Sequence, residues 1–318
     1  MKETIIGIEI GGTKLQIAIG TSEGELLDTI RCSVNADEGG KGIRKWLETN
    51  LNLLIKKAEN EYGPVRSIGC GFGGPINSRT GVVLSSVQVK GWQNFPLQEW
   101  LQATFSKPAS VDNDSNAAAY GEFCKGSGQG CEHFFYTNIG SGVGGGFIFN
   151  GKLFDGQGFG AGEFGHTFVP DLLSKESGKL LEIEHFCSGW SIESRLNRTG
   201  YVPINSELSN LSKRTTKDLA NAALSGDSFA IGEIDKVAHV FGIGLANVLN
   251  LTNIERIAIG GGVANIGSIL LDPIRKYTDQ YVFLNSKGRY TIHPSQLGDS
   301  VVLVGAILRA SGINSSNP

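Results

Sequence analysis

The chain has 318 residues, of which 40% are hydrophobic and 19% charged, so it can bury a sizeable core and its length fits about two domains. This composition excludes a disordered, a collagen-like or a disulfide-scaffold protein. The net charge is −3, and the sequence contains no block of like charges. We therefore expect neither a nucleic-acid partner nor a membrane partner.

The cysteines and the apolar segments near the two ends of the chain are evidence for the cellular compartment of the protein. The five cysteines are scattered and form no CxxC pair, which indicates reduced thiols in a cytoplasmic protein. Glu3 and Glu9 interrupt the first apolar stretch, so we expect no signal peptide. The apolar run Val301 to Leu308 is too short to span a bilayer.

The first half of the chain alternates predicted strands and helices. Residues 4–20 predict a strand, a Gly-Gly turn and a second strand, and residues 41–61 predict a helix from their apolar spacing. A strand near 67–71 leads into the glycine loop GFGGP (71–75). Further along come a short helix over 96–105, which begins with proline, a strand over 109–111 and an alanine-rich helix that begins near Asp114.

The second half opens with the same pattern as the first. Residues 133–154 predict strand, glycine turn and strand again, which fits two related domains. A long helix over 229–250 and a strand within 254–264 follow. Asp299 and Ser300 are predicted to cap a last helix that runs through Arg309.

Three glycine clusters follow predicted strands, and such turns let backbone N–H groups approach an anion. The segment Gly11–Lys14 adds a hydroxyl and a cation suited to phosphate, although a plain hairpin turn with an exposed lysine explains it equally well. The run GSGVGG (140–145) matches G-x-G-x-x-G, but a strand follows it where a dinucleotide fold needs a helix. With Gly260–Gly262, the clusters together favour a nucleotide site between two domains.

A few carboxylates and a histidine are candidates for chemistry. Asp114 at its helix start is either a cap or a functional carboxylate. Glu163 and His166, in the segment GAGEFGH (160–166), either complete an ordinary loop or bind a polyhydroxyl substrate. Glu184 opens a helical stretch, where an acidic residue also favours the helix dipole.

Taken together, these segments resemble the ROK family of sugar kinases, repressors and related proteins, within the hexokinase and actin superfamily. The resemblance covers most of the chain, from Gly7 to about Gly312. It implies an α/β fold of two hexokinase/actin-like (ribonuclease H-like) domains around a ligand cleft. The expected small domain comprises 1–115 plus 299–318, and the expected large domain comprises 116–298.

The resemblance also assigns site residues. The segment VDNDSNAAAYGE (111–122) is similar to the family's catalytic segment, which implies that Asp114 is the general base. The implied sugar ligands are Asn113, Glu163, His166, Glu184 and Gly74. The implied ATP and phosphate ligands are Gly11, Gly12, Thr13, Lys14, Gly140, Ser141, Gly142, Gly261 and Gly262. Glu9, where many members have aspartate, would sit near Mg²⁺ through water.

Two departures from the family pattern stand out. Many members carry a zinc cluster of the form C-x-C-G-x-x-G-C-x-E after the Gly-His pair, but residues 167–184 contain no cysteine. We therefore expect no zinc site and a His166 whose two ring nitrogens can serve the sugar and a second partner. Without the metal, we expect the loop to be held by packing of its apolar residues Phe168, Val169, Leu172, Leu173, Leu180 and Leu181. Gln88 stands where many members have asparagine, which bears on the choice of sugar.

The implied activity is ATP-dependent phosphorylation of a hexose hydroxyl by a cytoplasmic homodimer, with ATP and Mg²⁺ as cofactors. Glucose is the first expectation for the sugar, which would place the enzyme in glycolysis; N-acetylhexosamine, mannose and fructose are the alternatives. A repressor would carry a winged-helix domain before the first glycine loop, where only ten residues precede Gly11. A sugar-binding protein without catalysis is the other rival, and intact Asp114 and Lys14 argue against it.

Overall fold

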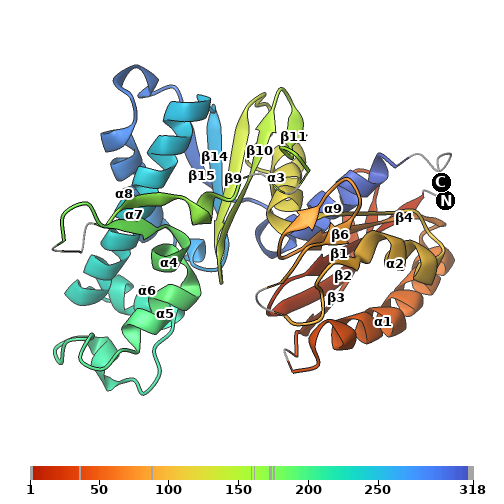
Figure 1. Cartoon of the computed structure of the whole chain (residues 1–318), viewed down its shortest axis with the longest axis horizontal. Helices are drawn as coiled ribbons and strands as arrows, with labels where there is room; N and C mark the ends of the chain where they lie inside the picture. The colour runs from red at the N-terminus through yellow and green to blue at the C-terminus, as the bar shows by residue number, and fades with distance from the viewer. Residues whose placement is uncertain are drawn as a thin grey trace. The chain divides into compact units, whose positions relative to one another are not determined.

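A computed structural model describes residues 3–35, 37–86, 89–158, 160, 162–171, 174 and 176–313. The chain divides into two compact units, shown with the labels used below in Figure 1. The first unit comprises residues 1–130, 146–162 and 296–318, and the second comprises 131–145 and 163–295. No helix of the described residues is long and apolar enough to cross a membrane.

The first sheet has the strand order β3-β2-β1-β4-β8. Its strands are β1 (Thr4–Ile10), β2 (Lys14–Thr21), β3 (Leu26–Ser33), β4 (Val65–Phe72) and β8 (Ala109–Asn113). Antiparallel pairing joins β1 to β2 and β2 to β3, whereas β4 runs parallel to both β1 and β8. The carboxyl ends of β1, β4 and β8 therefore lie along one edge of the sheet.

Strand β1 is buried on both faces because helices cover both. Its residues alternate between the faces. Ile6 and Ile8 join the core cluster that includes Leu47 of α1 (Gly39–Glu61), whereas Ile5 packs with Ile307 of α9 (Val301–Ser311). Figure 1 shows the sheet between these two helices.

The segment between β4 and β8 packs against α1. It forms the small sheet β5 (Ile76–Asn77), β6 (Val82–Val83) and β7 (Phe95–Pro96), followed by α2 (Leu97–Phe105). Pro96 takes the N-cap position of α2, one residue before the predicted first turn. Trp92 is fully buried, with ring centroids 5.2 Å from Phe72 and 5.3 Å from Phe95.

The second sheet repeats the first, with the order β11-β10-β9-β14-β15. Its strands are β9 (Phe134–Ile139), β10 (Val143–Phe149), β11 (Lys152–Phe154), β14 (Arg256–Gly260) and β15 (Thr291–Pro294). In each sheet, three strands that are consecutive in the sequence lie side by side. Two further strands then pair in parallel beside the first of the three. The repeated strand–turn–strand that the sequence predicts is thus confirmed, as is the α/β fold class.

Helices of the second unit form a further layer. They are α4 (Glu184–Cys187), α5 (Gly189–Leu196), α6 (Thr216–Leu224), α7 (Ser228–Thr252) and α8 (Ser268–Tyr281). The apolar helix α7 packs along α8, and the hairpin β12 (Phe168–Pro170) with β13 (Leu180–Glu182) also contacts α7. Single turns of 3-10 helix occur at Phe164–His166, Glu207–Asn210, Ala264–Ile266, Leu284–Ser286 and Gly298–Ser300.

Helix α3 (Asp114–Lys125) belongs to the first unit by its packing on α9. A Cβ on Gly305 would lie 1.7 Å from the carbonyl oxygen of Ala117, and one on Gly121 would lie 2.7 Å from that of Val301. Only glycine permits so close an approach of two helices. The first segment of this unit consequently extends to Gly130, whereas the sequence places a domain boundary after residue 115.

The start of α9 differs from expectation. Ser300 holds the N-cap position but its side chain makes no capping hydrogen bond. The preceding 3-10 turn already gives Ser300 helical backbone angles, φ −95° and ψ −3°, whereas a capping serine adopts extended ones. The prediction that Asp299 and Ser300 cap this helix through their side chains is therefore wrong for Ser300.

Candidate functional site

The first glycine loop is a tight turn between β1 and β2. Gly11 N donates to Lys14 O at 2.9 Å, which leaves Gly12 and Thr13 at the tip, where Thr13 is exposed. Lys14 Nζ lies 3.0 Å from Glu9 Oε1 and 3.3 Å from the carbonyl oxygen of Asp299. The hairpin and the phosphate-loop interpretations are therefore compatible, because the same turn presents N–H groups and a cation.

Glu9 is the buried carboxylate beneath this loop. It is 7% exposed, and its second oxygen accepts a hydrogen bond from Gln16 Nε2. Burial raises the pKa of Glu9, although Lys14 and Gln16 act in the opposite direction. Since Lys14 and Gln16 already contact its two oxygens, the geometry fits a contact with a magnesium ion through water better than direct coordination.

Asp114 lies at the carboxyl end of β8, next to the ends of β1 and β4. A Cβ on Gly73 would lie 3.2 Å from Asp114 Oδ2 and 3.4 Å from Gly11 Cα. The N-cap of α3 is Asn113, whose Oδ1 accepts from the backbone N–H groups of Ser115 and Asn116. Asn113 and not Asp114 is thus the helix cap. Asp114 is the acidic residue of the first turn of α3 and accepts a hydrogen bond from Ser115 Oγ at 3.3 Å.

Asn113 has a second contact that orders the neighbouring loop. Its Nδ2 donates to Gly74 O at 3.2 Å, which joins the GFGGP loop to the start of α3. Asp112 supports the same turn, since its Oδ1 accepts from Asn113 N at 2.9 Å. Arg309 Nε lies 3.3 Å from Asp112 Oδ2. The predicted residues Asn113, Asp114 and Gly74 therefore form one connected group.

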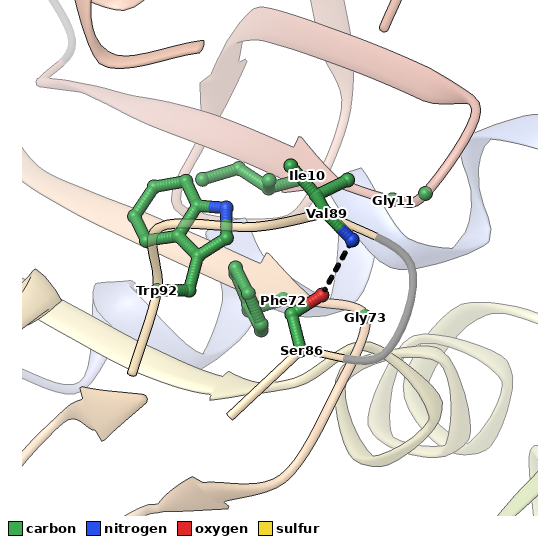
Figure 2. Close-up of a pocket in the computed structure, with 8 residues that line it drawn as sticks. Ile10, Gly11, Phe72, Gly73, Ser86, Val89 and Trp92 are labelled. Atoms are coloured by element: carbon green, nitrogen blue, oxygen red, sulfur yellow. Dashed lines mark hydrogen bonds between the residues drawn. The ribbon is translucent and has the colours of Figure 1, made fainter. Parts of the chain in front are cut away.

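Figure 2 shows a small pocket beside these residues. It is lined by Ile10, Gly11, Gly12, Phe72, Gly73, Ser86, Val89 and Trp92. Val89 N donates to Ser86 Oγ at 3.1 Å, so these two residues of the lining are joined directly. Gln88 lies outside the described residues.

The second glycine loop joins β9 to β10. Gly140 N donates to Gly142 O at 2.9 Å, and Ser141 is exposed at the tip. The following element is strand β10, which confirms that the G-x-G-x-x-G run is not a dinucleotide fold. Glu184 Oε2 accepts from Val143 N at 2.8 Å, and a Cβ on Gly142 would lie 2.6 Å from the same oxygen. Glu184 therefore supports this loop from α4, and a larger residue at 142 would displace the Glu184 carboxylate.

The third glycine cluster is tied to the second loop. Val263 N donates to Ile139 O at 2.9 Å, and a Cβ on Gly261 would lie 2.4 Å from the same carbonyl oxygen. Gly261 has φ +90°, and Gly262 is exposed. The second glycine loop and the third glycine cluster are thus adjacent within the second unit, and backbone groups of both lie on one surface.

Glu163 and His166 flank the single 3-10 turn Phe164–His166. Phe164 anchors the turn in the core, with ring centroids 5.7 Å from Phe135 and 5.1 Å from Phe241. His166 Nε2 lies 4.0 Å from Glu163 Oε2. Both side chains are more than half exposed, so they are available to a ligand.

Glu182 was missed by sequence reasoning. Its Oε1 lies 2.5 Å from His166 Nδ1 and its Oε2 lies 3.1 Å from His185 Nδ1. The hydrogen bond to Glu182, opposed by burial, raises the pKa of His166, with further contributions from Glu184 and Glu163. The sequence did contain a signal for Glu182, because it stands two residues before Glu184, where the family's zinc pattern has its last cysteine. Gln16 and Asp299 were also missed. Gln16 is the cross-strand partner of Glu9 in the predicted hairpin, whereas only the fold brings the Asp299 carbonyl group to Lys14 and Gln16.

The loop between His166 and Glu184 is held only partly as expected. Val169 is buried, whereas Phe168 is 58% and Leu180 61% exposed, because both lie on the outer face of the β12–β13 hairpin. The prediction that these two side chains pack the loop is wrong. Leu172 and Leu173 lie outside the described residues. Among the described residues, no three His, Cys, Asp or Glu side chains gather as metal ligands would.

Comparisons with known proteins agree with this architecture. The sequence model described as "ROK family" matches residues 5–312. A glucokinase of Halalkalibacterium halodurans is 31% identical over 94% of this chain and 92% of its own length, and a xylose repressor of Caldicellulosiruptor bescii is 30% identical over 96% of this chain and 77% of its own. A ROK family glucokinase from Streptomyces griseus, solved in complex with glucose and AMPPNP, superposes with a TM-score of 0.80 at 29% identity and covers 96% of this chain and 99% of its own. The chain belongs to the ROK family.

Proposed function

We propose that this protein transfers the γ-phosphoryl group of ATP to a hydroxyl of a hexose, with glucose as substrate and glucose 6-phosphate as product. The observation that carries the proposal is Asp114. Its carboxylate stands at the ends of three adjacent strands, next to the Gly73 turn and the first glycine loop, while Asn113 supplies the helix cap. A carboxylate so placed can accept the proton of a sugar hydroxyl as it attacks phosphorus.

The glycine loops supply the rest of what phosphoryl transfer needs. Positioning and charge neutralisation dominate this reaction, and backbone N–H groups at Gly11–Thr13 and Gly140–Gly142 are suited to phosphate oxygens. Lys14 adds a positive charge, held in place by Glu9. When bound with ATP, Mg²⁺ would neutralise further phosphate charge, with Glu9 as the residue that holds its water.

The sugar ligands of the proposal are Asn113, Gly74, Glu163, His166 and Glu184. Carboxylates and imidazole can each bind hydroxyls, and a site of paired polar groups discriminates strongly against compounds that lack a hydroxyl. The choice of glucose draws support from the relatives named as glucokinases and from the glucose-bound structure. A homodimer in the cytoplasm completes the proposal.

The test is an assay of ATP consumption by the purified protein, with glucose, mannose, fructose and N-acetylhexosamines in parallel. We expect the highest kcat/KM with glucose. A higher kcat/KM with another hexose would replace glucose in the proposal. Sugar binding by calorimetry without turnover of any hexose would instead identify a sugar-sensing protein.

A further inference from the structure

The acidic residue Glu182 links two histidines at the edge of the candidate sugar site. Both of its oxygens are used, one on Nδ1 of His166 at 2.5 Å and the other on Nδ1 of His185 at 3.1 Å. The Glu182 side chain is only 16% exposed, whereas each imidazole is more than half exposed. The carboxylate is thus a buried support with two solvent-facing rings attached to it.

This arrangement fixes which nitrogen of His166 carries a proton. An ionised carboxylate can only accept hydrogen bonds, so Nδ1 of His166 has to be the donor. The opposite nitrogen, Nε2, then points to the Glu163 side, where it lies 4.0 Å from Glu163 Oε2. That separation is too long for a hydrogen bond between the two and leaves Nε2 and the Glu163 carboxylate available to a third group.

The local backbone explains why Glu182 can reach both rings. In the β12–β13 hairpin Glu182 pairs with Phe168, two residues after His166, and His185 follows in the first turn of α4. Buried Val169 and Ile183 hold the hairpin and the start of α4 in the core. Glu182 is therefore held by packed elements and not by an exposed loop.

We propose that Glu182 is a positioning residue for sugar binding: it orients the His166 ring and holds its proton at Nδ1, so that Nε2 and Glu163 each accept a hydrogen bond from one of two neighbouring sugar hydroxyls. This inference rests on the proposed function. Three carboxylates influence His166, namely Glu163, Glu182 and Glu184, while His185 shares the Glu182 carboxylate from the other side. Glu182 makes the closest contact with the ring, so its removal has the largest effect on the titration of His166.

The first experiment needs no substrate. Long-range ¹H–¹⁵N correlation spectra report the tautomer and the titration of each of the five histidines, and a His166→Asn variant assigns the signal. We expect the Nδ1–H tautomer in the wild type and a lower pKa of His166 in Glu182→Gln than in the wild type. In Glu182→Ala the Nδ1–H preference should disappear. An unchanged titration and tautomer in both variants would overturn the proposal.

The second experiment links the ring to the sugar. In Glu182→Gln we expect the KM for glucose to rise about tenfold, with the KM for ATP unchanged. Glu182→Asp, which keeps the charge but is one methylene shorter, should recover part of the glucose affinity. Glu176→Gln is the matched control, since it removes the same charge from an exposed position of the same loop and should leave both KM values as they are.

The two experiments separate the possible failures. If no hexose is phosphorylated, the proposed function fails, and glucose affinity from calorimetry replaces KM as the readout for Glu182. If the spectra change in Glu182→Gln while glucose affinity does not, His166 is oriented by Glu182 but does not serve the sugar, and the inference is refuted. A rise in both the glucose and the ATP KM would indicate a general disturbance of the unit and would also refute it.

Discussion

Asp114 and Asn113 are neighbours with different tasks, and the difference comes from their backbone positions. Asn113 has extended angles, φ −62° and ψ 144°, so its side chain folds back onto the first N–H groups of α3. Asp114 is the first helical residue, and one of its oxygens lies close to Gly73, which also adjoins Gly11. The helix cap Asn113 and the proposed general base Asp114 are therefore adjacent in the sequence.

Replacing Asp114 tests the base directly. Asp114→Asn removes the proton acceptor but retains shape, so kcat should fall by about 10²–10⁴-fold while the affinity for ATP stays close to that of the wild type. Steady-state kinetics and nucleotide titration are the measurements. Because Asn113 supplies the cap, the melting temperature should change little. A variant with more than about a tenth of the wild-type kcat would exclude Asp114 as the base.

The sugar ligands of the second unit can be tested without catalysis. Glu163→Ala, His166→Ala and Glu184→Ala should each weaken glucose binding by about 1–3 kcal/mol, because a hydroxyl or its partner loses a hydrogen bond. Calorimetry in the absence of ATP measures this. Glu184→Ala also removes the acceptor of Val143 N–H, so we expect only this variant to lower nucleotide affinity as well. Unchanged glucose affinity in all three would move the sugar site elsewhere.

Among the elements, the β12–β13 hairpin lies in the stretch where the family pattern would place a zinc cluster. Here Val169 and Leu181 are cross-strand partners, and buried Val169 faces the core. The exposed Phe168 and Leu180 contribute little to this packing. Hydrogen bonds from Ile183 N to Thr167 O and from Asp171 N to Lys179 O close the two ends. Packing and backbone pairing hold the described part of the hairpin.

We therefore predict that the protein folds and works without zinc. A structural zinc site needs four close ligands, usually cysteine or histidine, and the stretch 167–184 has none of either. Elemental analysis of protein purified without added metal should find zinc far below one equivalent. After chelation and addition of Mg²⁺ alone, melting temperature and activity should both be retained. Stoichiometric zinc, or a collapse of stability on chelation, would contradict this.

Helix α6 has a capping box whose effect depends on pH. Thr215 Oγ1 accepts from Asp218 N at 3.2 Å, while Thr215 N donates to Asp218 Oδ2 at 2.9 Å. Hydrogen bonds from the Thr215 side chain and backbone lower the pKa of Asp218 from its usual 3.8. A lowered pKa means that the stabilisation is present above pH 3.8 and is lost as the pH falls through the still lower value of the folded state.

Asp218→Asn should consequently reduce the free energy of unfolding by about 0.3–1 kcal/mol at neutral pH, because it removes a negative charge from the first turn of α6. The difference between variant and wild type should shrink as the pH falls below 3.8, where the wild type also loses the charge. Urea unfolding across a pH series measures it, with Glu23→Gln in the β2–β3 turn as the charge-matched control. A difference independent of pH would mean that the carboxylate charge has no part in the cap.

At the scale of the whole molecule, both sheets use the same strand order, and each has a glycine turn between its first two strands. The same β-hairpin therefore offers a phosphate-sized turn in each unit. A backbone hydrogen bond closes each turn, from Gly11 N to Lys14 O in the first and from Gly140 N to Gly142 O in the second, which is one residue shorter. One supersecondary motif thus accounts for both proposed phosphate loops.

We predict a homodimer in solution. Leu251, Phe283 and Leu284 are 86%, 61% and 73% exposed, and Asn250 brings them together, since its side chain accepts from Phe283 N at 2.7 Å. Exposed apolar side chains that cluster favour association. Sedimentation at micromolar concentration should give twice the 33.9 kDa of one chain. A single species of monomer mass would contradict the prediction.

The sequence alone determined the fold class, the repeated strand–turn–strand units and the identity of most proposed site residues. Hydrophobic periodicity and glycine turns are local signals, and they located α1, α7 and both glycine loops. The tertiary structure decided that Asn113 and not Asp114 caps α3, that Glu184 also supports Val143, and that Glu182 joins two histidines. These contacts depend on side-chain directions and on strand register. Residues such as Gln16 and Asp299 meet only because packing brings distant segments together, and no pattern of spacing along the chain records that.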